Sequence, residues 1–181
     1  MVQTQICSDA SRRALSFFQQ NPLISRSLLS DCNHDFEQVT TIIEPLLNPT
    51  ARCSVAAHYI QAIATERTSF LATNLTPAPD LQITDLSSSW LVGRGARCAI
   101  SIQDSSVSRC HSVISYCPEN GFYLTDVGSS NGTFLNCRRI PTLERLSLRD
   151  GDLIQFGNVQ VEFFLSIHQS EAIAFSDATF F

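Results

Sequence analysis

Apolar side chains in the first part of the chain recur at helical spacing. Between residues 8 and 75 they return every three or four positions, which places them on one face of an α-helix. Asn21-Pro22 and Asn48-Pro49 each offer an N-cap residue followed by a proline at the first helical position. The pattern predicts short helices near residues 9–20, 22–30, 34–47 and 50–73.

The pattern changes from Leu81 onward, where apolar and polar residues alternate. Alternation over four to eight residues is typical of half-buried strands, and turn residues separate these segments at close spacing. All seven glycines of the chain lie in this part. The pattern predicts an all-β sandwich or barrel, with strands at residues 81–86, 89–94, 99–103, 111–117, 121–127, 132–136, 145–148, 152–157 and 159–167.

The stretch T-P-A-P-D, residues 76–80, divides the two patterns. Proline cannot continue a helix and favours extended backbone before it, so this stretch is predicted to be a linker. The expected fold class is α+β and multidomain, with a helical segment followed by an all-β sandwich. We expect separate cores in a helical region at 1–75 and a β domain at 81–168, and a C-terminal tail at 169–181.

Composition narrows the functional classes. Hydrophobic residues make up 44% and charged residues 16% of the chain, which is typical of a globular protein. The net charge of −5 argues against a general nucleic-acid binder. All twelve basic residues are arginine, which excludes a P-loop lysine and a lysine nucleophile. No apolar run approaches the roughly 18 residues of a membrane span, and no secretory pattern opens the chain, so a cytoplasmic location is expected.

The number and spacing of the cysteines indicate free thiols. Seven is an odd number and no C-x-x-C pair occurs, so in the absence of a secretory pattern we expect them to be reduced. Cys110 and His111 are neighbours in the chain, which is a poor start for a tetrahedral zinc site. Asp126, Asp150 and Asp152 are expected to organise turns, because a calcium loop needs more carboxylates at alternate positions. No metal and no cofactor are predicted.

Polar residues gather in three of the predicted loops. One loop begins with Gly93-Arg94, a second carries D-S-S-V-S-R-C-H at 104–111, and a third carries G-S-S-N-G at 128–132. The loops of a sandwich cluster at its two ends, so these three can converge. A guanidinium, several hydroxyls and an amide suit a doubly charged phosphate, because Arg supplies charge and Ser and Asn supply orienting hydrogen bonds.

The order of four motifs resembles the forkhead-associated (FHA) family. The motifs are G-R at 93–94, S-R-C-H at 108–111, S-S-N-G-T at 129–133 and L-R-D-G-D-L-I-Q-F-G at 148–157. The resemblance runs from about Leu81 to Ile167, and the helical region before it matches no motif that we recognise. It implies an eleven-stranded β-sandwich whose loops bind phosphothreonine peptides.

The resemblance implies that five residues bind the phosphopeptide. Arg94 and Ser108 would contact the phosphate. Asn131 would hydrogen-bond the backbone of the bound peptide and fix its register. Arg109 and Ser130 would line the same face as auxiliary contacts.

Three further residues are expected to support the site. Gly93 is interpreted as a backbone requirement, and Gly132 as the residue that lets the Asn-Gly turn form. By resemblance, His111 would brace the loops through hydrogen bonds to backbone. Selection of the residue three after the phosphothreonine would depend on the loops at 103–106 and 136–139, and the arginine pair in the second favours an acidic residue.

The sequence predicts a phosphothreonine-binding adaptor in signal transduction rather than an enzyme. Its partner would be a phosphothreonine-containing protein that is the substrate of a Ser/Thr kinase, and the helices would dock a partner or form a homo-oligomer. The alternative is an FHA-like scaffold that binds no phosphopeptide and acts through helix-mediated assembly. Ser108, His111 and Asp126 superficially offer a catalytic triad, but the residue order supplies no oxyanion hole, so catalysis is not expected.

Overall fold

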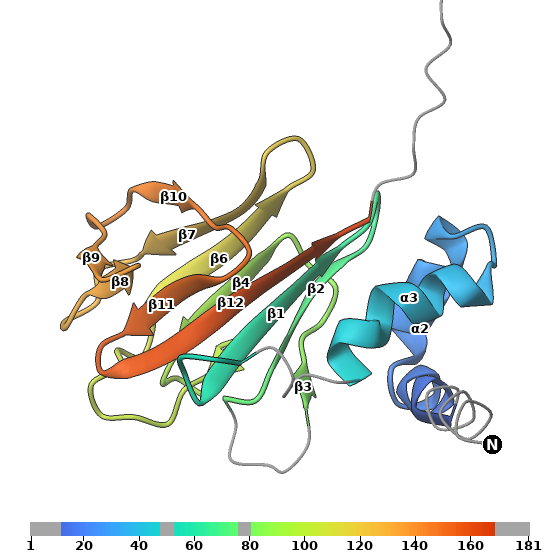
Figure 1. Cartoon of the computed structure of the whole chain (residues 1–181). Helices are drawn as coiled ribbons and strands as arrows, with labels where there is room; N and C mark the ends of the chain where they lie inside the picture. Colours follow the sequence, from blue (N-terminus) through green and yellow to red (C-terminus); the bar gives the residue numbers. More distant parts are fainter. Residues whose placement is uncertain (1–11, 48–52, 76–80, 169–181) are drawn as a thin grey trace, which may run out of the picture.

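The computed structural model describes residues 12–47, 53–75 and 81–168. Three N-terminal helices precede a mixed β-sandwich of two sheets (Figure 1). The first helix is described from residue 12 to residue 20, and α2 (Pro22–Asp31) and α3 (Phe36–Leu47) follow it. Among the helices described, none combines the length and the apolar character that crossing a bilayer requires.

Local sequence explains where the helices begin. α2 starts at the proline of the first Asn-Pro pair, where a missing N–H costs nothing. Asp35 caps α3, because its Oδ1 accepts hydrogen bonds from the backbone N–H of Glu37 at 2.9 Å and of Gln38 at 3.2 Å. The helices predicted at 22–30 and 34–47 are therefore confirmed.

The helix predicted at 50–73 is wrong. This segment contains an antiparallel hairpin of β1 (His58–Ala64) and β2 (Ser69–Thr73). Every residue of β1 from Tyr59 onward is buried, because one face packs into the sandwich and the other lies under the helices. A strand buried on both faces loses its polar alternation, and its apolar positions then imitate helical spacing.

The other strands follow the nine segments predicted from alternation. Each predicted segment contains a strand, and β9 is an addition of only two residues, too short to give a pattern. The described residues form twelve strands rather than the eleven that the resemblance implies. Those after the hairpin are β3 (Gln82–Ile83), β4 (Ser89–Gly93), β5 (Ile100–Ser101), β6 (Ser112–Cys117), β7 (Gly121–Asp126), β8 (Thr133–Leu135), β9 (Arg138–Arg139), β10 (Arg145–Ser147), β11 (Asp152–Phe156) and β12 (Val159–Ile167).

The strands form two sheets, with the orders β3-β2-β1-β12-β11-β8-β9 and β10-β7-β6-β4-β5. β1 runs parallel to β12, with His58 opposite Val161. The hairpin therefore belongs to the same sheet as the strands after residue 81, and the larger sheet begins inside the predicted helical region 1–75. The predicted linker at 76–80 and the tail at 169–181 lie outside the described residues.

Two hydrophobic cores share the larger sheet. Trp90, Phe122 and Phe163 fill the core between the two sheets. Ile63 and Phe70 project from the outer face of the larger sheet and pack against the helices, and both are fully buried. The helices are thus docked on the sandwich, and β1 and β2 contribute to both cores, so the predicted boundary at 76–80 does not divide one core from the other.

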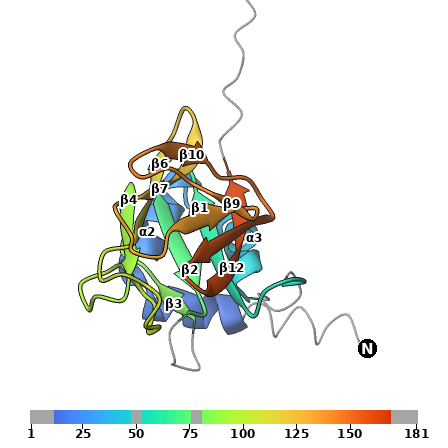
Figure 2. The ribbon, with the colours of Figure 1, turned by 90° about the vertical axis from the view of Figure 1, so that its left-hand side faces the viewer.

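The arrangement leaves one end of the sandwich clear of the helices. Figure 1 shows α2 and α3 beside β1 and β2, while β8 and β9 lie at the other edge of that sheet. Figure 2 views the molecule from that other edge, with the helices behind the sheets. The loops that carry the polar motifs join strands at this end.

Candidate functional site

The loop after β4 and the loop before β6 run side by side. The backbone N–H of Arg94 donates to Ser108 O at 2.9 Å, and that of Gly95 donates to Arg109 O at 3.0 Å. A Cβ added to Gly93 would lie 2.5 Å from Arg109 O and 2.8 Å from Ser108 O. Only glycine permits this approach of two backbones, so Gly93 positions the loops without contacting solvent.

His111 joins the second loop to the third. Its Nδ1 accepts a hydrogen bond from the N–H of Ser108 at 3.0 Å, so Nδ1 carries no proton. Its Nε2 therefore donates to Gly132 O at 3.2 Å. The imidazole is fully buried, and burial lowers its pKa against the opposing effects of the Gly132 hydrogen bond and of Asp126. A neutral imidazole in this tautomer braces both loops.

Asp126 holds the turn of the third loop from beneath. Its carboxylate is 2% exposed and accepts hydrogen bonds from the N–H of Gly128 at 2.8 Å, the N–H of Ser129 at 2.9 Å and the hydroxyl of Thr133 at 2.6 Å. Burial acts to raise the pKa of Asp126, but these bonds and one from the Ser129 hydroxyl lower it to about 2. Gly132 completes the turn at φ +87°, a conformation that favours glycine.

The braced loops bring two serines together. The N–H of Ser130 donates to the Ser108 hydroxyl at 3.0 Å, and the Ser108 hydroxyl lies 3.4 Å from that of Ser130. Ser108 is half-buried and Ser130 is exposed. Both hydroxyls are therefore available beside one another at the mouth of the site.

Asn131 is held by Ser106, a residue that the sequence assigned only to a variable loop. Its side-chain N–H donates to Ser106 O at 2.7 Å. Ser106 is itself fixed, because its N–H donates to the Asp104 carboxylate at 2.8 Å and its hydroxyl accepts from the N–H of Asn158 at 2.9 Å. Hydrogen bonds from Ser106 lower the pKa of Asp104. The Asp-x-Ser spacing indicates an Asx turn, but no local feature of the sequence indicates the contact between Ser106 and Asn131.

The three loops enclose an open cavity of about 630 Å³ with a positive lining. Arg94 and Arg109 are exposed, and Arg94 Nε donates to Val107 O at 3.3 Å, which orients the guanidinium. The lining contains two arginines and no carboxylate, so the cavity favours an anion. It is formed by Arg94, Ser105, Ser106, Val107, Ser108, Arg109, Cys110, Gly128, Ser130 and Asn131.

The structure therefore brings the five predicted ligand contacts, Arg94, Ser108, Arg109, Ser130 and Asn131, to one cavity. The three predicted supporting residues, Gly93, His111 and Gly132, are buried outside its lining. Of the other lining residues, the sequence assigned Ser105 and Ser106 only to a variable loop and gave Val107, Gly128 and the exposed Cys110 no role in ligand contact.

The geometry does not assemble the triad considered from the sequence. Both nitrogens of His111 are engaged by backbone groups, and the Ser108 hydroxyl bonds Ser130 instead. The string at 128–132 has the G-x-S-x-G spacing of a nucleophile elbow, but it joins β7 to β8 and not a strand to a helix. Within the described ranges, no group of three His, Cys, Asp or Glu side chains is arranged to hold a metal ion.

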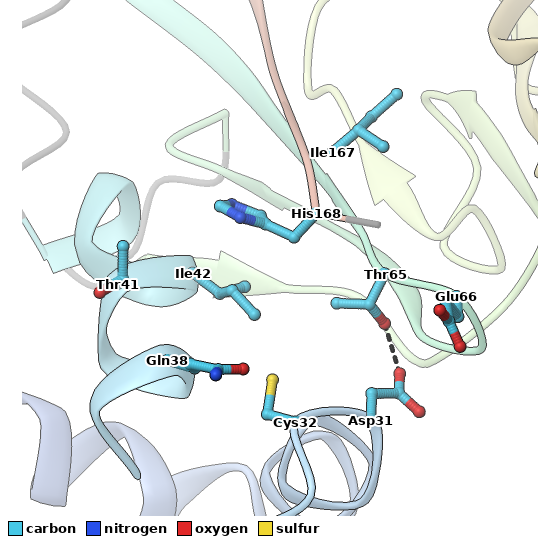
Figure 3. A pocket seen from close by; sticks show the side chains of 9 residues that line it. All are labelled: Asp31, Cys32, Gln38, Thr41, Ile42, Thr65, Glu66, Ile167 and His168. Carbon is cyan, nitrogen blue, oxygen red and sulfur yellow. Dashed lines mark hydrogen bonds between the residues drawn. The ribbon is translucent and has the colours of Figure 1, made fainter. Parts of the chain in front are cut away.

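A second cavity, of about 390 Å³, lies between the helices and the β1–β2 turn (Figure 3). Asp31 at the end of α2 accepts hydrogen bonds from the hydroxyls of Thr65 and Thr68, the latter at 2.6 Å. Burial and the neighbouring Asp31 raise the pKa of the Cys32 thiol, which points into the cavity. These contacts attach α2 to the hairpin and give this cavity a structural role.

Comparison with known proteins places the cavity in a domain family. Residues 90–157 match the family model described as the FHA domain. Kanadaptin of Homo sapiens is 35% identical over 99 residues, which cover 49% of this chain and 13% of kanadaptin. Smad nuclear-interacting protein 1 of Mus musculus is 35% identical over 96 residues, which cover 46% of this chain and 25% of that protein.

A similar solved structure is the solution structure of the FHA domain of a hypothetical protein of Arabidopsis thaliana. It is 33% identical, with a TM-score of 0.42, and the match covers 50% of this chain and 79% of that chain. The chain spans a quarter or less of the two curated relatives named above.

Proposed function

We propose that this chain, whose residues 90–157 form an FHA domain, binds phosphothreonine-containing proteins through the cavity between its loops and acts as a signalling adaptor. In this proposal Arg94 and Ser108 contact the phosphate. Asn131 hydrogen-bonds the peptide backbone, and Arg109 and Ser130 add contacts along the same face.

The observation that carries the proposal is the charge of the cavity lining. Two arginines, four serines and one asparagine line one space, and no carboxylate lines it. A phosphothreonine brings nearly two negative charges and three acceptor oxygens at neutral pH. A guanidinium meets such a group with a planar fork of donors, and hydrogen bonds to a charged group are stronger than those between neutral groups.

The braced loops add a second argument for ligand binding. His111, Asp126 and Ser106 fix the three loops before any ligand arrives. Loops that are already ordered lose less conformational entropy when they bind. The arrangement therefore favours a ligand site that is rigid before binding, rather than one whose loops become ordered only on contact with the ligand.

Arg139 suggests an acidic preference beside the phosphothreonine. A Cβ added to Gly132 would lie 2.7 Å from Arg139 Nε and 3.1 Å from its Cζ, so the guanidinium covers Gly132. Gly132 follows Asn131, which lines the cavity. A peptide held by Asn131 would pass close to this third positive charge.

A degenerate phosphothreonine peptide library tests the function and this preference together. The full chain is used, because β1 and β2 belong to the larger sheet. We expect phosphothreonine peptides to be enriched over unphosphorylated ones, with acidic residues favoured after the phosphothreonine. Arg139→Ala should remove the acidic preference, whereas Arg145→Ala should retain it, since Arg145 stacks on Tyr123 at 4.6 Å. Equal capture of both libraries would overturn the proposal.

The alternative function is assembly through the helices without phosphopeptide binding. The observation in its favour is that the helices expose large apolar side chains, with Leu23 74% and Leu15 53% exposed. The two functions are compatible, because the helices pack against β1 and β2, whereas the cavity is lined by the loops that follow β4, precede β6 and join β7 to β8. If the library shows no enrichment of phosphothreonine peptides, assembly through the helices becomes the favoured function of this chain.

A further inference from the structure

Two cysteines flank the Arg109 carbonyl group at the candidate site. The N–H of Cys98 donates to Gly95 O at 3.0 Å and closes the turn after β4. The thiol of Cys98 donates to Arg109 O at 3.1 Å. Cys110, the next residue after Arg109, is exposed and lines the cavity. The two thiols therefore belong to adjoining loops that both contribute to ligand binding.

The backbone limits how far apart these thiols lie. Across a trans peptide, a carbonyl oxygen is about 2.8 Å from the next Cα, and the described chain has no cis peptide bond. The contact between Cys98 Sγ and Arg109 O therefore puts this sulfur within about 6 Å of Cys110 Cα. A disulfide joins Cβ atoms about 3.8 Å apart, so rotation of the exposed Cys110 side chain and a small loop movement bring the sulfurs together.

The electrostatics agree with this proximity. Burial raises the pKa of the Cys98 thiol and the neighbouring Cys110 raises it further, while a hydrogen bond with Gly95 lowers it. Oxidants reach exposed thiols first, and Cys110 is exposed whereas Cys98 is half-buried. Because of this difference in exposure, Cys110 is the cysteine that the oxidant reaches first, and Cys98 is the cysteine that then forms the disulfide with it.

We propose that Cys98 and Cys110 form a reversible disulfide that controls the phosphopeptide cavity, a regulation that rests on the function proposed above. The oxidant is a hydroperoxide. The Cys110 thiol loses its proton, and its sulfur takes one oxygen atom from the peroxide as the O–O bond breaks. With that proton returned, Cys110 becomes a sulfenic acid, and the peroxide leaves as an alcohol, or as water in the case of hydrogen peroxide. The Cys98 thiol then loses its proton and attacks the Cys110 sulfur; the S–S bond forms as the S–O bond breaks, and the hydroxide that leaves takes up this proton and becomes water. A dithiol reductant returns both residues to thiols.

The disulfide disturbs the residues that hold the ligand. It removes the hydrogen bond from Cys98 to Arg109 O and draws Cys110 out of the cavity lining. The Arg109 carbonyl is already packed against Gly93 and Gly95, so it cannot move closer to the strand. The peptide unit between Arg109 and Cys110 has to turn instead, which displaces the side chain of Arg109 and the adjacent Ser108.

Disulfide mapping tests the site without any peptide. The reduced full chain is treated with hydrogen peroxide, its remaining thiols are blocked, and its fragments are analysed by mass spectrometry. We expect a Cys98–Cys110 link in the wild type and none in the Cys98→Ser variant, whose hydroxyl still donates to Arg109 O. Cys117→Ser, at the end of β6, is the matched control and should form the link. Oxidation of other thiols without this link would overturn the proposal.

Binding measured on the same samples tests the regulation. A fluorescent pool of degenerate phosphothreonine peptides should bind the oxidised wild type about tenfold more weakly, the loss of about one hydrogen bond to a charged group. A dithiol reductant should restore binding, and Cys98→Ser should bind equally with and without peroxide. A link that forms without a change in affinity would contradict the regulation. If the reduced protein does not bind the pool, the proposed function fails, while the mapping still decides whether the disulfide forms.

Discussion

Asp126 illustrates at the residue scale how a buried carboxylate can organise a binding loop that it does not itself line. It accepts hydrogen bonds from the backbone of Gly128 and Ser129 and orients Thr133, so Ser130 and Asn131 are presented to the cavity. Its pKa of about 2 means that the folded protein favours the charged form more strongly than the unfolded chain does. Asp126 therefore contributes stability that depends on pH.

The Asp126→Asn substitution tests this contribution. The Asp126 pKa lies below the ordinary Asp value, and this lowering corresponds to about 2 kcal/mol of folding stability. That stability is lost as the pH falls from about 4 towards 2. We expect the variant to unfold about 2 kcal/mol more easily at pH 7, with a difference from wild type that shrinks below pH 4. Chemical denaturation at several pH values measures this, with Asp85→Asn as the exposed control. A difference that stays constant with pH would show that the charge is not responsible.

At this scale the sequence predicted which loops line the cavity better than how those loops are held. Arg94, Ser108 and Asn131 were assigned to the site by the order of their motifs, and the structure places all three in the lining of one cavity. Ser106 was assigned only to a variable loop, because its role as a clamp depends on a carbonyl that meets Asn131 across 25 residues. A contact of this kind leaves no local pattern in the sequence.

At the element scale, strands with one solvated face were predictable and the doubly buried hairpin was not. Alternation marked every strand from β3 onward except the two-residue β9. β1 and β2 were mistaken for a helix because the helices cover their outer face and replace the polar half of the pattern with Ile63, Phe70 and Ala72. Because the helices pack on β1 and β2, these two strands lack the polar alternation by which the other strands were predicted from the sequence.

Shared packing predicts that helices and sandwich unfold together. Phe70 is fully buried between them, so Phe70→Ala should cost about 3–5 kcal/mol, whereas Leu23→Ala, at a 74% exposed position, should cost little. Trp90, the only tryptophan, reports the sandwich core by fluorescence, and far-ultraviolet circular dichroism reports the helices. We expect both signals to change at one denaturant concentration. Two separated transitions would contradict the shared core.

At the scale of the whole molecule, the chain has a cavity at the loops of the sandwich and a separate face that the helices cover. The cavity is formed by loops at the end of the sandwich, and the helices cover the outer face of β1 and β2 (Figure 2). Under the proposed function, this separation would allow the chain to hold a phosphorylated partner and a second contact at the same time. The net charge of −5 makes the local pair of arginines at the cavity more distinctive, since the molecule as a whole does not attract anions.

The central claim is that Arg94 neutralises a bound phosphate, and isothermal titration of one library-derived phosphothreonine peptide tests it most directly. Truncation of one partner of a buried charge pair costs about 2–5 kcal/mol, and a hydrogen bond to a charged group is worth about 1.5–3 kcal/mol. We therefore expect Arg94→Ala to weaken binding most and Ser108→Ala less. Asn131→Ala should weaken binding by an amount independent of the phosphate, as the unphosphorylated peptide will show.

Arg94→Lys should restore binding only in part, because an ammonium lacks the planar fork. An Arg94→Ala variant that keeps its melting temperature and binds as tightly as wild type would contradict the account.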